Sequence, residues 1–129
     1  MNETLLNAPG KSDPLSGIEA VLLRIFLGSR DRVGGDALFD VVVRKAREAG
    51  IGGATVLKGF LGYGANSVVH HAGLFHLSQD LPVIIELIDE EAKIKAFLPA
   101  LEGLLSGGGL ITLETVQVLG YQPDTEAAR

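Results

Sequence analysis

The pattern that most constrains this chain is a strand, an amphipathic helix and a strand, followed by the same order of elements again. The almost wholly apolar run at 18–27 predicts a buried strand. Apolar residues then recur every three or four positions over 38–49, which predicts a helix with Asp36 as its N-cap. Gly50 stands where a left-handed residue commonly ends a helix. The run 55–57 predicts the second strand, which completes the first unit.

The second unit repeats this order. The run LPVIIELI at 81–88 predicts a strand, and Asp89 is suited to cap the helix that follows. An apolar stripe over 94–105 predicts that helix, with Pro99 expected to kink it or shift its turn. The run 115–119 predicts the last strand. The chain is therefore expected to contain four strands and two helices in the order βαββαβ.

This order predicts a ferredoxin-like α+β sandwich. Each crossover from a strand through a helix to a parallel strand is right-handed, so both helices should cover one face of an antiparallel sheet. The polar, Gly- and Pro-containing ends are expected to be tails, which leaves residues 18–121 as the single domain between tails at 1–17 and 122–129.

Apolar residues on both faces of the strands predict self-association. A sheet covered by helices on one face normally carries polar residues on the other. Here that second face is also expected to be apolar, apart from three charged residues: Arg24, Lys58 and Glu86. An uncovered face of this kind would be a large exposed apolar patch, so we expect copies of the chain to pack sheet against sheet. The charges are then expected to be paired, Lys58 with Glu86.

Composition excludes several functional classes. The 129 residues carry a net charge of -5 and include no cysteine, which argues against nucleic-acid binding, disulfides and thiolate metal sites. No uninterrupted apolar run approaches the length of a membrane-spanning helix, and the N-terminus lacks the pattern of a secretory signal. No serine–histidine–acid set or carboxylate pair is indicated by spacing. A cytoplasmic, non-enzymatic protein is therefore expected.

Three glycines follow the second strand of the first unit. Gly59, Gly62 and Gly64 lie within six positions in the sequence KGFLGYG. Closely spaced glycines after a strand mark either a sharp exit or a backbone that another group approaches closely. Exposed main-chain amides in such a turn can also bind an anion. Spacing alone leaves a purely structural role and a ligand-binding role both open.

These residues resemble those of a known superfamily. The stretch TVLKGF at 55–60 is similar to the strand that precedes the long loop of PII signalling proteins, and a PII-like family of unknown function is a closer match. The resembling stretches are LRIFLG (23–28), KAREAGIGGATVLKGFLGYG (45–64), HLSQDLPVIIELID (76–89), KIKAFLP (93–99) and GLITLETVQVL (109–119).

The resemblance implies a homotrimer that binds a small effector, most simply an adenine nucleotide, in clefts between subunits. It also implies a loop that contacts a protein partner such as an ion channel or transporter, because genes of the closer family often lie beside those of fluoride-exporting channels. The ligand-binding residues implied are Gly59, Gly62, Tyr63, Gly64, Gly107, Gly108 and Gly109, to which the basic sequence SRDR adds Arg30 and Arg32 as candidates. The partner-binding loop at 63–73 includes Asn66, Ser67, His70 and His71.

The charge pattern departs from that of PII proteins. The segments that match their phosphate-contacting regions read GYGANS, GGGLIT and VLGYQP, and contain no Lys or Arg. A triphosphate without cationic partners is costly to bind, so a nucleoside monophosphate or cyclic nucleotide fits better than ATP. Arg30, Arg32 and Lys58 are the cations that remain for phosphate contact. The alternative role of the two arginines is as solvated loop charges, and that of Lys58 is the pair with Glu86.

Two other functions stay open on the sequence. One is a ligand-free trimeric scaffold. The other is metal binding by His70 and His71, because the trimeric copper-tolerance protein CutA has the same fold. A metal site normally needs three or four ligands, and two adjacent histidines do not supply them. The sequence therefore predicts no resident cofactor and no metal site.

Overall fold

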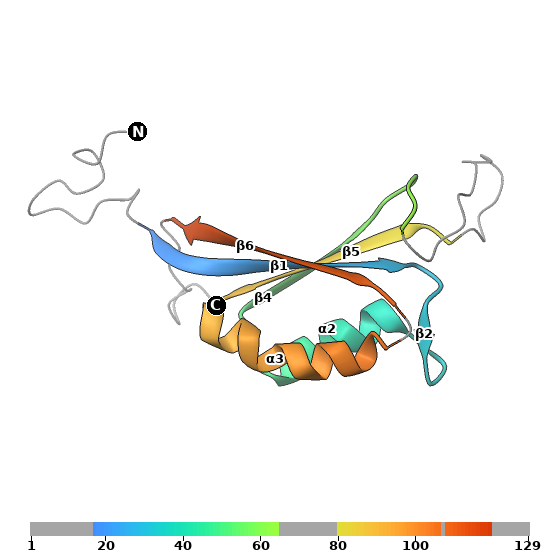
Figure 1. The fold of residues 1–129 in the computed structure, drawn as a ribbon, viewed down its shortest axis with the longest axis horizontal. Helices are drawn as coiled ribbons and strands as arrows, with labels where there is room; N and C mark the ends of the chain where they lie inside the picture. The colour runs from blue at the N-terminus through green and yellow to red at the C-terminus, as the bar shows by residue number, and fades with distance from the viewer. Residues whose placement is uncertain (1–16, 65–79, 107, 120–129) are drawn as a thin grey trace, which may run out of the picture.

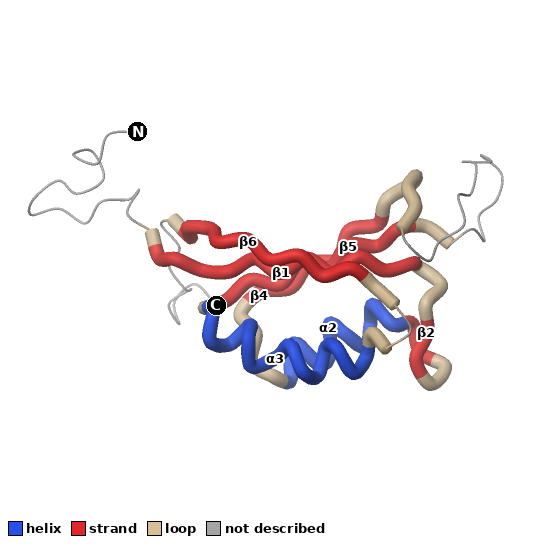
Figure 2. The backbone as a smooth tube through the Cα atoms, viewed as in Figure 1, coloured by secondary structure: helices blue, strands red, loops and turns tan. Residues whose placement is uncertain are grey.

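A computed structural model describes residues 17–64, 80–106 and 108–119 of the chain. These residues form two layers, a twisted sheet and a pair of helices that lie on the same face of it (Figures 1 and 2). The elements are β1 (Ile18–Gly28), β2 (Arg32–Val33), β3 (Asp36–Ala37), α2 (Leu38–Glu48), β4 (Gly53–Lys58), β5 (Pro82–Asp89), α3 (Glu91–Leu104) and β6 (Leu110–Val118).

The large sheet has the strand order β4-β5-β1-β6, and every neighbouring pair is antiparallel. The two strands joined through each helix, β1 with β4 and β5 with β6, are therefore not neighbours. This is the ferredoxin-like arrangement expected from two crossovers of the same hand. The predicted α+β fold with both helices on one face is confirmed.

The sequence pattern missed two details of the strands. Residues 32–37 form a two-stranded hairpin, β2 and β3, whose strands are too short to give an apolar pattern. The last strand begins at Leu110, earlier than the predicted residue 115. Its first half alternates little because it lies at a sheet edge, where both faces of the strand are partly exposed.

The core lies between the sheet and the helices. Alternate residues of the two central strands point into it and are almost completely buried, as are the apolar stripes of both helices. They include Leu23, Ile25, Val83, Ile85 and Leu87 from the sheet and Val42, Ala46, Ile94, Phe97 and Leu101 from the helices. Burial of one large apolar side chain contributes about 1.5–3 kcal/mol, so this layer accounts for the main stabilisation of the domain.

The first helix, α2, begins differently from the prediction but ends as predicted. Asp36 is not the N-cap, because residue 36 pairs with Val33 in the small hairpin and its carboxylate lies 3.3 Å from Arg44 instead. The N-cap is Ala37, which offers no side-chain acceptor. Gly50 has φ +82°, so the predicted left-handed residue after the helix is confirmed.

The second helix also begins one residue later than predicted. Asp89 is the last residue of β5, and the N-cap is Glu90. The Asp89 carboxylate still accepts the Glu90 amide at 2.7 Å, and it accepts the amide of Gly52 at 2.8 Å as well. Helix α3 continues through Pro99, which lies inside its span.

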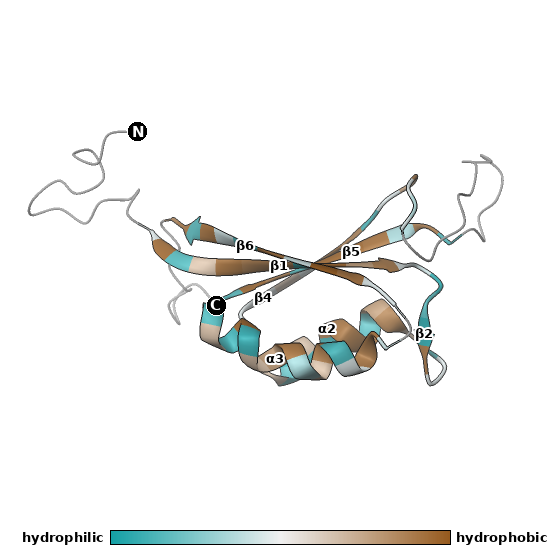
Figure 3. Cartoon of the chain, in the orientation of Figure 1, coloured by the Kyte–Doolittle hydropathy of each residue, from teal (hydrophilic) through white to brown (hydrophobic). Residues whose placement is uncertain are grey.

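The sheet face opposite the helices is apolar in cross-strand rows. Phe26 lies beside Ile84 and Leu110, and Leu22 lies beside Ile88. Because both helices cover the other face, no element among the described residues covers this one (Figures 1 and 3). The prediction of strands that are apolar on both faces is confirmed. We call this the open face.

The charges on the open face pair differently from the prediction. Arg24 donates from Nε to the Glu86 carboxylate at 2.9 Å and from its guanidinium to Glu114 on the other side. These two carboxylates raise the pKa of Arg24 above its ordinary value, Glu86 contributing first. Lys58 lies beside Val83, a core residue, and therefore on the helix side of the sheet, so the predicted Lys58–Glu86 pair is wrong. The reason is register, since Thr55 is the residue opposite Glu86.

Candidate functional site

Three segments that the sequence analysis singled out, and the start of β5, lie at one end of the sheet, on the right of Figure 1. There β1 and β4 end while β5 and β6 begin, because neighbouring strands are antiparallel. Register places Gly28 opposite Pro82, Lys58 opposite Val83 and Phe26 opposite Leu110. We call this region, formed by residues 28–32, 59–64, 80–82 and 108–110, the glycine end of the sheet.

The glycines after β4 are packed against Pro82. A Cβ atom at Gly59 would lie 2.9 Å from Cγ of Pro82, and one at Gly62 would lie 3.1 Å from the same atom. The Gly59 amide also donates to the Pro82 carbonyl at 2.7 Å. The backbone therefore bends closely around the proline ring, which leaves no room for an unstrained Cβ at Gly59 and little room for one at Gly62. A structural reason for glycine is therefore present at both positions.

Three large apolar side chains are exposed where the chain leaves β4. Phe60 is 84% exposed, Tyr63 is 74% exposed and Leu61 is 61% exposed, and Gly64 is exposed beside them. Aromatic rings held this far into solvent by a bend fixed on a proline form an apolar surface at the glycine end. Of these residues, the sequence analysis had named Tyr63 and Gly64 as ligand contacts and had not named Phe60.

The glycines before β6 shape a helix-to-strand turn. The Gly108 amide donates to the Leu105 carbonyl at 2.8 Å, and its φ of +119° is one that other residues rarely adopt. A Cβ at Gly109 would lie 3.4 Å from both Leu27 and Leu105. Gly107 lies outside the described residues. The turn thus has a structural reason for glycine at residues 108 and 109.

The two glycine segments lie at opposite edges of the sheet. Residues 59–64 follow edge strand β4, and residues 108–109 precede edge strand β6. Three strand spacings separate the edges, or about 14 Å at ~4.8 Å each. One chain alone therefore does not enclose a small ligand between the two segments. A cleft made from both needs a second copy of the chain.

The turn after β1 is tied to the start of β5. The Ser29 amide donates to the Leu81 carbonyl at 2.7 Å, and the Leu81 amide donates to the Ser29 hydroxyl at 3.0 Å. Asp80 accepts the Arg30 amide at 2.9 Å, and Asp31 accepts the Gly28 amide at 2.9 Å. Sequence reasoning did not find Ser29 or Asp80, because their partners lie about fifty positions away and nothing local marks them.

Arg30 and Arg32, the two arginines of this turn, make different contacts. Arg32 donates from its guanidinium to the Gly35 carbonyl at 3.0 Å, which fixes the β2–β3 hairpin. Arg30 is exposed and contributes its main-chain amide to Asp80. Both therefore lie at the glycine end, with a structural contact assigned to each. The predicted loop residues Asn66, Ser67, His70 and His71 lie outside the described part of the chain.

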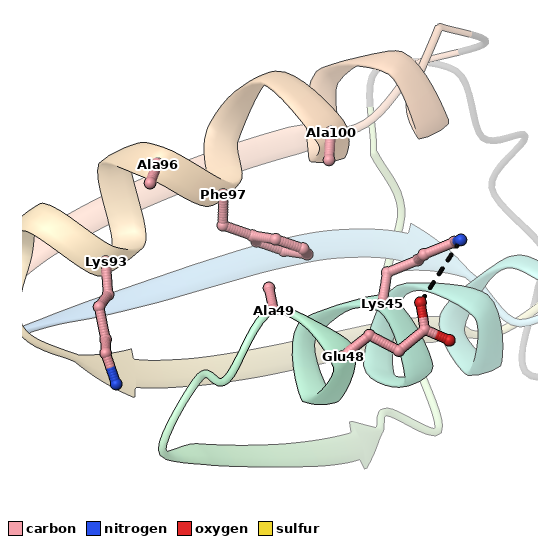
Figure 4. A pocket seen from close by; sticks show the side chains of 7 residues that line it. All are labelled: Lys45, Glu48, Ala49, Lys93, Ala96, Phe97 and Ala100. Atoms are coloured by element: carbon pink, nitrogen blue, oxygen red, sulfur yellow. Dashed lines mark ion pairs between the residues drawn. The ribbon is translucent and has the colours of Figure 1, made fainter.

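A hollow lies between the helices, away from every predicted site residue (Figure 4). It has a volume of about 320 Å³, and Phe97 forms part of its wall with small side chains around it. Lys45 and Glu48 of α2 line it and form an ion pair at 3.6 Å, while Lys93 lines it from α3. The remaining lining residues are Ala49, Ala96 and Ala100.

Two carboxylates outside the glycine end, Asp89 and Glu91, have structural partners that lower their pKa. Burial of Asp89 disfavours its charge, but the amides of Glu90 and Gly52 and the nearby Lys93 outweigh this and hold its pKa below the ordinary value. A hydrogen bond from Lys95 lowers the pKa of Glu91 in the same direction. Among residues 17–64, 80–106 and 108–119, no three acidic or histidine side chains gather as metal ligands would. In that same part of the chain, no helix has both the length and the apolar character needed to cross a membrane.

Sequence comparison matches residues 20–118 to the model of the DUF190 family, described as an uncharacterized ACR. A UPF0166 protein of Aquifex aeolicus (strain VF5) is 40% identical over 102 residues, covering 79% of this chain and 95% of the relative. A UPF0166 protein of Methanocaldococcus jannaschii is 38% identical over 108 residues, covering 84% of this chain and 97% of the relative.

Structural comparison gives the same fold in PII-like proteins. CPII, a nitrogen regulatory PII-like protein from Thiomonas intermedia K12 solved with ADP, AMP and bicarbonate, aligns with a TM-score of 0.60 at 16% identity, over 78% of this chain and 89% of that one. A putative PII-like signaling protein from Thermus thermophilus aligns with a TM-score of 0.58 at 18% identity, over 79% and 91% of the two chains. At these identities the likeness establishes the fold.

Proposed function

This chain belongs to the DUF190 family and has the PII-like fold, and on that premise we propose that it is a regulatory module that binds a small effector, an adenine nucleotide of low charge. The effector would bind between copies of the chain at the glycine end of the sheet. Effector binding would then alter contact with a protein partner, for which an ion channel or transporter in the membrane is the candidate. The proposal includes no catalytic step and places the protein in the cytoplasm.

The observation that carries the proposal is the arrangement of the glycine end. Gly62 to Gly64 and Gly108 to Gly109 lie at the same end of the sheet but at opposite edges. Copies packed through their open faces can bring edge β4 of one beside edge β6 of the next. The two glycine segments would then face each other across a cleft, beside the exposed rings of Phe60 and Tyr63. Aromatic faces suit a planar base.

Charge at the glycine end supports a ligand with few negative charges. Asp31 and Asp80 both lie in this region, and Arg30 and Arg32 supply the positive charge nearby. Two carboxylates would repel the closely spaced charges of a triphosphate. A monophosphate or cyclic nucleotide has less charge to compensate. That CPII was solved with ADP and AMP supports adenine nucleotides as the class to test first.

The open face supports assembly of the chain into a homotrimer. Its apolar rows would be buried between copies, and Arg24 already neutralises part of the acidic charge there through Glu86 and Glu114. A regulatory effect requires that the effector bind two states of the assembly unequally, because equal binding shifts no equilibrium.

The test is isothermal titration of the full chain with AMP, ADP, ATP and cyclic AMP, after light scattering has given the mass of the assembly. The proposal expects saturable micromolar binding that is tighter for AMP or cyclic AMP than for ATP. Tyr63→Ala should weaken that binding, while Gly103→Ala, in an open position on α3, serves as the matched control. No binding of any of these at millimolar concentration contradicts the proposal and leaves the trimeric scaffold as the function to examine.

A further inference from the structure

The carboxylate of Asp80 occupies the space where a side chain at position 28 would begin. A Cβ atom at Gly28 would lie 2.5 Å from Oδ1 of Asp80, closer than atoms can pack, so a side chain at position 28 and this carboxylate cannot both occupy these positions. The same oxygen accepts the Arg30 amide at 2.9 Å and the Ser29 hydroxyl at 3.5 Å. We call the group formed by Gly28, Ser29 and the Arg30 amide the Asp80 seat.

The seat is held in place without Asp80. Main-chain and hydroxyl hydrogen bonds join Ser29 to Leu81 in both directions, at 2.7 and 3.0 Å. Asp31 fixes the other side of the turn by accepting the Gly28 amide at 2.9 Å. Because these bonds do not involve the Asp80 side chain, the donors of the seat stay oriented when that carboxylate is absent. Preoriented donors reduce the cost of binding.

The seat has the chemistry of an oxyanion site. A main-chain amide, a hydroxyl and a glycine that allows close approach bind phosphate or carboxylate oxygens in many proteins. Here the oxyanion bound by these groups is the carboxylate of Asp80. Pro82 joins the seat to the bend after β4, since it lies opposite Gly28 and its carbonyl accepts the Gly59 amide. The seat is therefore part of the glycine end.

We propose that the Asp80 seat is an anion-binding site blocked by the Asp80 carboxylate, and that one oxyanion group of the effector binds there by displacing that carboxylate. This inference rests on the proposed function for the identity of the effector, but the seat itself is tested without it. Asp31 stays beside the site, so the site favours a singly substituted phosphate over a chain of phosphates. Asp80 is thus a residue that sets both affinity and charge preference.

The experiment compares the wild-type chain with Asp80→Ala, titrating inorganic phosphate and then AMP by calorimetry. Removal of the competing carboxylate should raise the affinity for phosphate about tenfold or more, since one charge and two hydrogen-bond donors are released. Glu102→Gln, an exposed carboxylate on α3, is the control for the change in net charge. It should leave phosphate binding as in the wild type.

A second variant tests where the phosphate binds. In the Asp80→Ala background, Gly28→Ala no longer meets a carboxylate and places a methyl group in the empty seat. The double variant should fold, as its circular dichroism and melting temperature will report, and should lose the gained phosphate binding. If phosphate binds Asp80→Ala no better than the wild type, or binds the double variant equally well, the inference is wrong. Wild-type AMP binding with no gain in Asp80→Ala would reject the seat while keeping the proposed function.

Discussion

Asp89 is expected to be the most important carboxylate for stability, because three elements meet at it. Its oxygens accept the Gly52 amide at 2.8 Å and the Glu90 amide at 2.7 Å, which joins the entry of β4 and the start of α3 to the end of β5. Lys93 lies 3.6 Å from it and also donates to the Gly50 carbonyl. The side chain is 13% exposed, so water replaces these contacts only in part.

Asp89→Ala should therefore destabilise the protein by about 2–3 kcal/mol. A net contribution of roughly 1.5–3 kcal/mol is typical for each hydrogen bond to a charged group, and the two amides regain some of it from water since Gly52 and Glu90 are exposed. The exposed Lys93 adds at most about 0.5 kcal/mol. Urea unfolding at fixed protein concentration measures the difference, which matters because an oligomer's stability depends on concentration.

Acid titration gives an independent measure of the same interaction. Since the folded pKa of Asp89 lies below its ordinary value of 3.8, ionised Asp89 stabilises the fold above that pH. This contribution decreases as the pH falls below 3.8 and is lost below the folded pKa. Glu91→Gln, which removes an exposed pair with Lys95, is the matched control and should change stability much less, because water screens that pair. An Asp89→Ala variant that is no less stable than Glu91→Gln would refute this reasoning.

Further predictions concern the bend after β4 and the open face. Gly59→Ala should lower the free energy of unfolding by about 1–3 kcal/mol, because its Cβ would lie 2.9 Å from Pro82. Gly103→Ala on α3 meets no other atom and should raise the free energy of unfolding by up to about 1 kcal/mol. Urea unfolding of both variants measures these two changes. Phe26→Glu should shift light scattering toward lower mass by placing a charge in an apolar row, and an unchanged mass would exclude the open face as an interface. Arg24→Ala should also weaken association, since Glu86 and Glu114 lose their shared cation, and sedimentation equilibrium measures the change.

Much of the fold could be predicted from local pattern. The strands at 18–27 and 81–88 are nearly continuous apolar runs, and the helix at 38–49 has an apolar stripe, so their types and approximate bounds followed from periodicity. Gly50 was placed correctly because a left-handed helix end depends only on the nearest residues. Asp36 and Asp89 were both wrongly assigned as N-caps. Asp36 belongs to the β2–β3 hairpin and Asp89 is the last residue of β5, and strand pairing of this kind is not visible in the local sequence.

Much less of the candidate site could be predicted. The glycines were recognised, but their close contact with Pro82 joins residues about twenty positions apart and has no local signal. The Asp80 seat joins residues about fifty positions apart in the same way. The side of the sheet on which Lys58 lies was predicted wrongly, because a single-residue difference in register moves a side chain to the other face.

The sequence by itself determined the order of elements, the two-sided apolar character of the strands and the family to which the chain belongs, because these depend on residue type and spacing. Only the tertiary structure decided which groups are partners: Arg24 with two carboxylates, Asp80 with the turn at Gly28, and the glycine segments at opposite edges of one end of the sheet. Such pairings depend on strand order and register. Those are fixed by packing of the whole core rather than by any short stretch of residues.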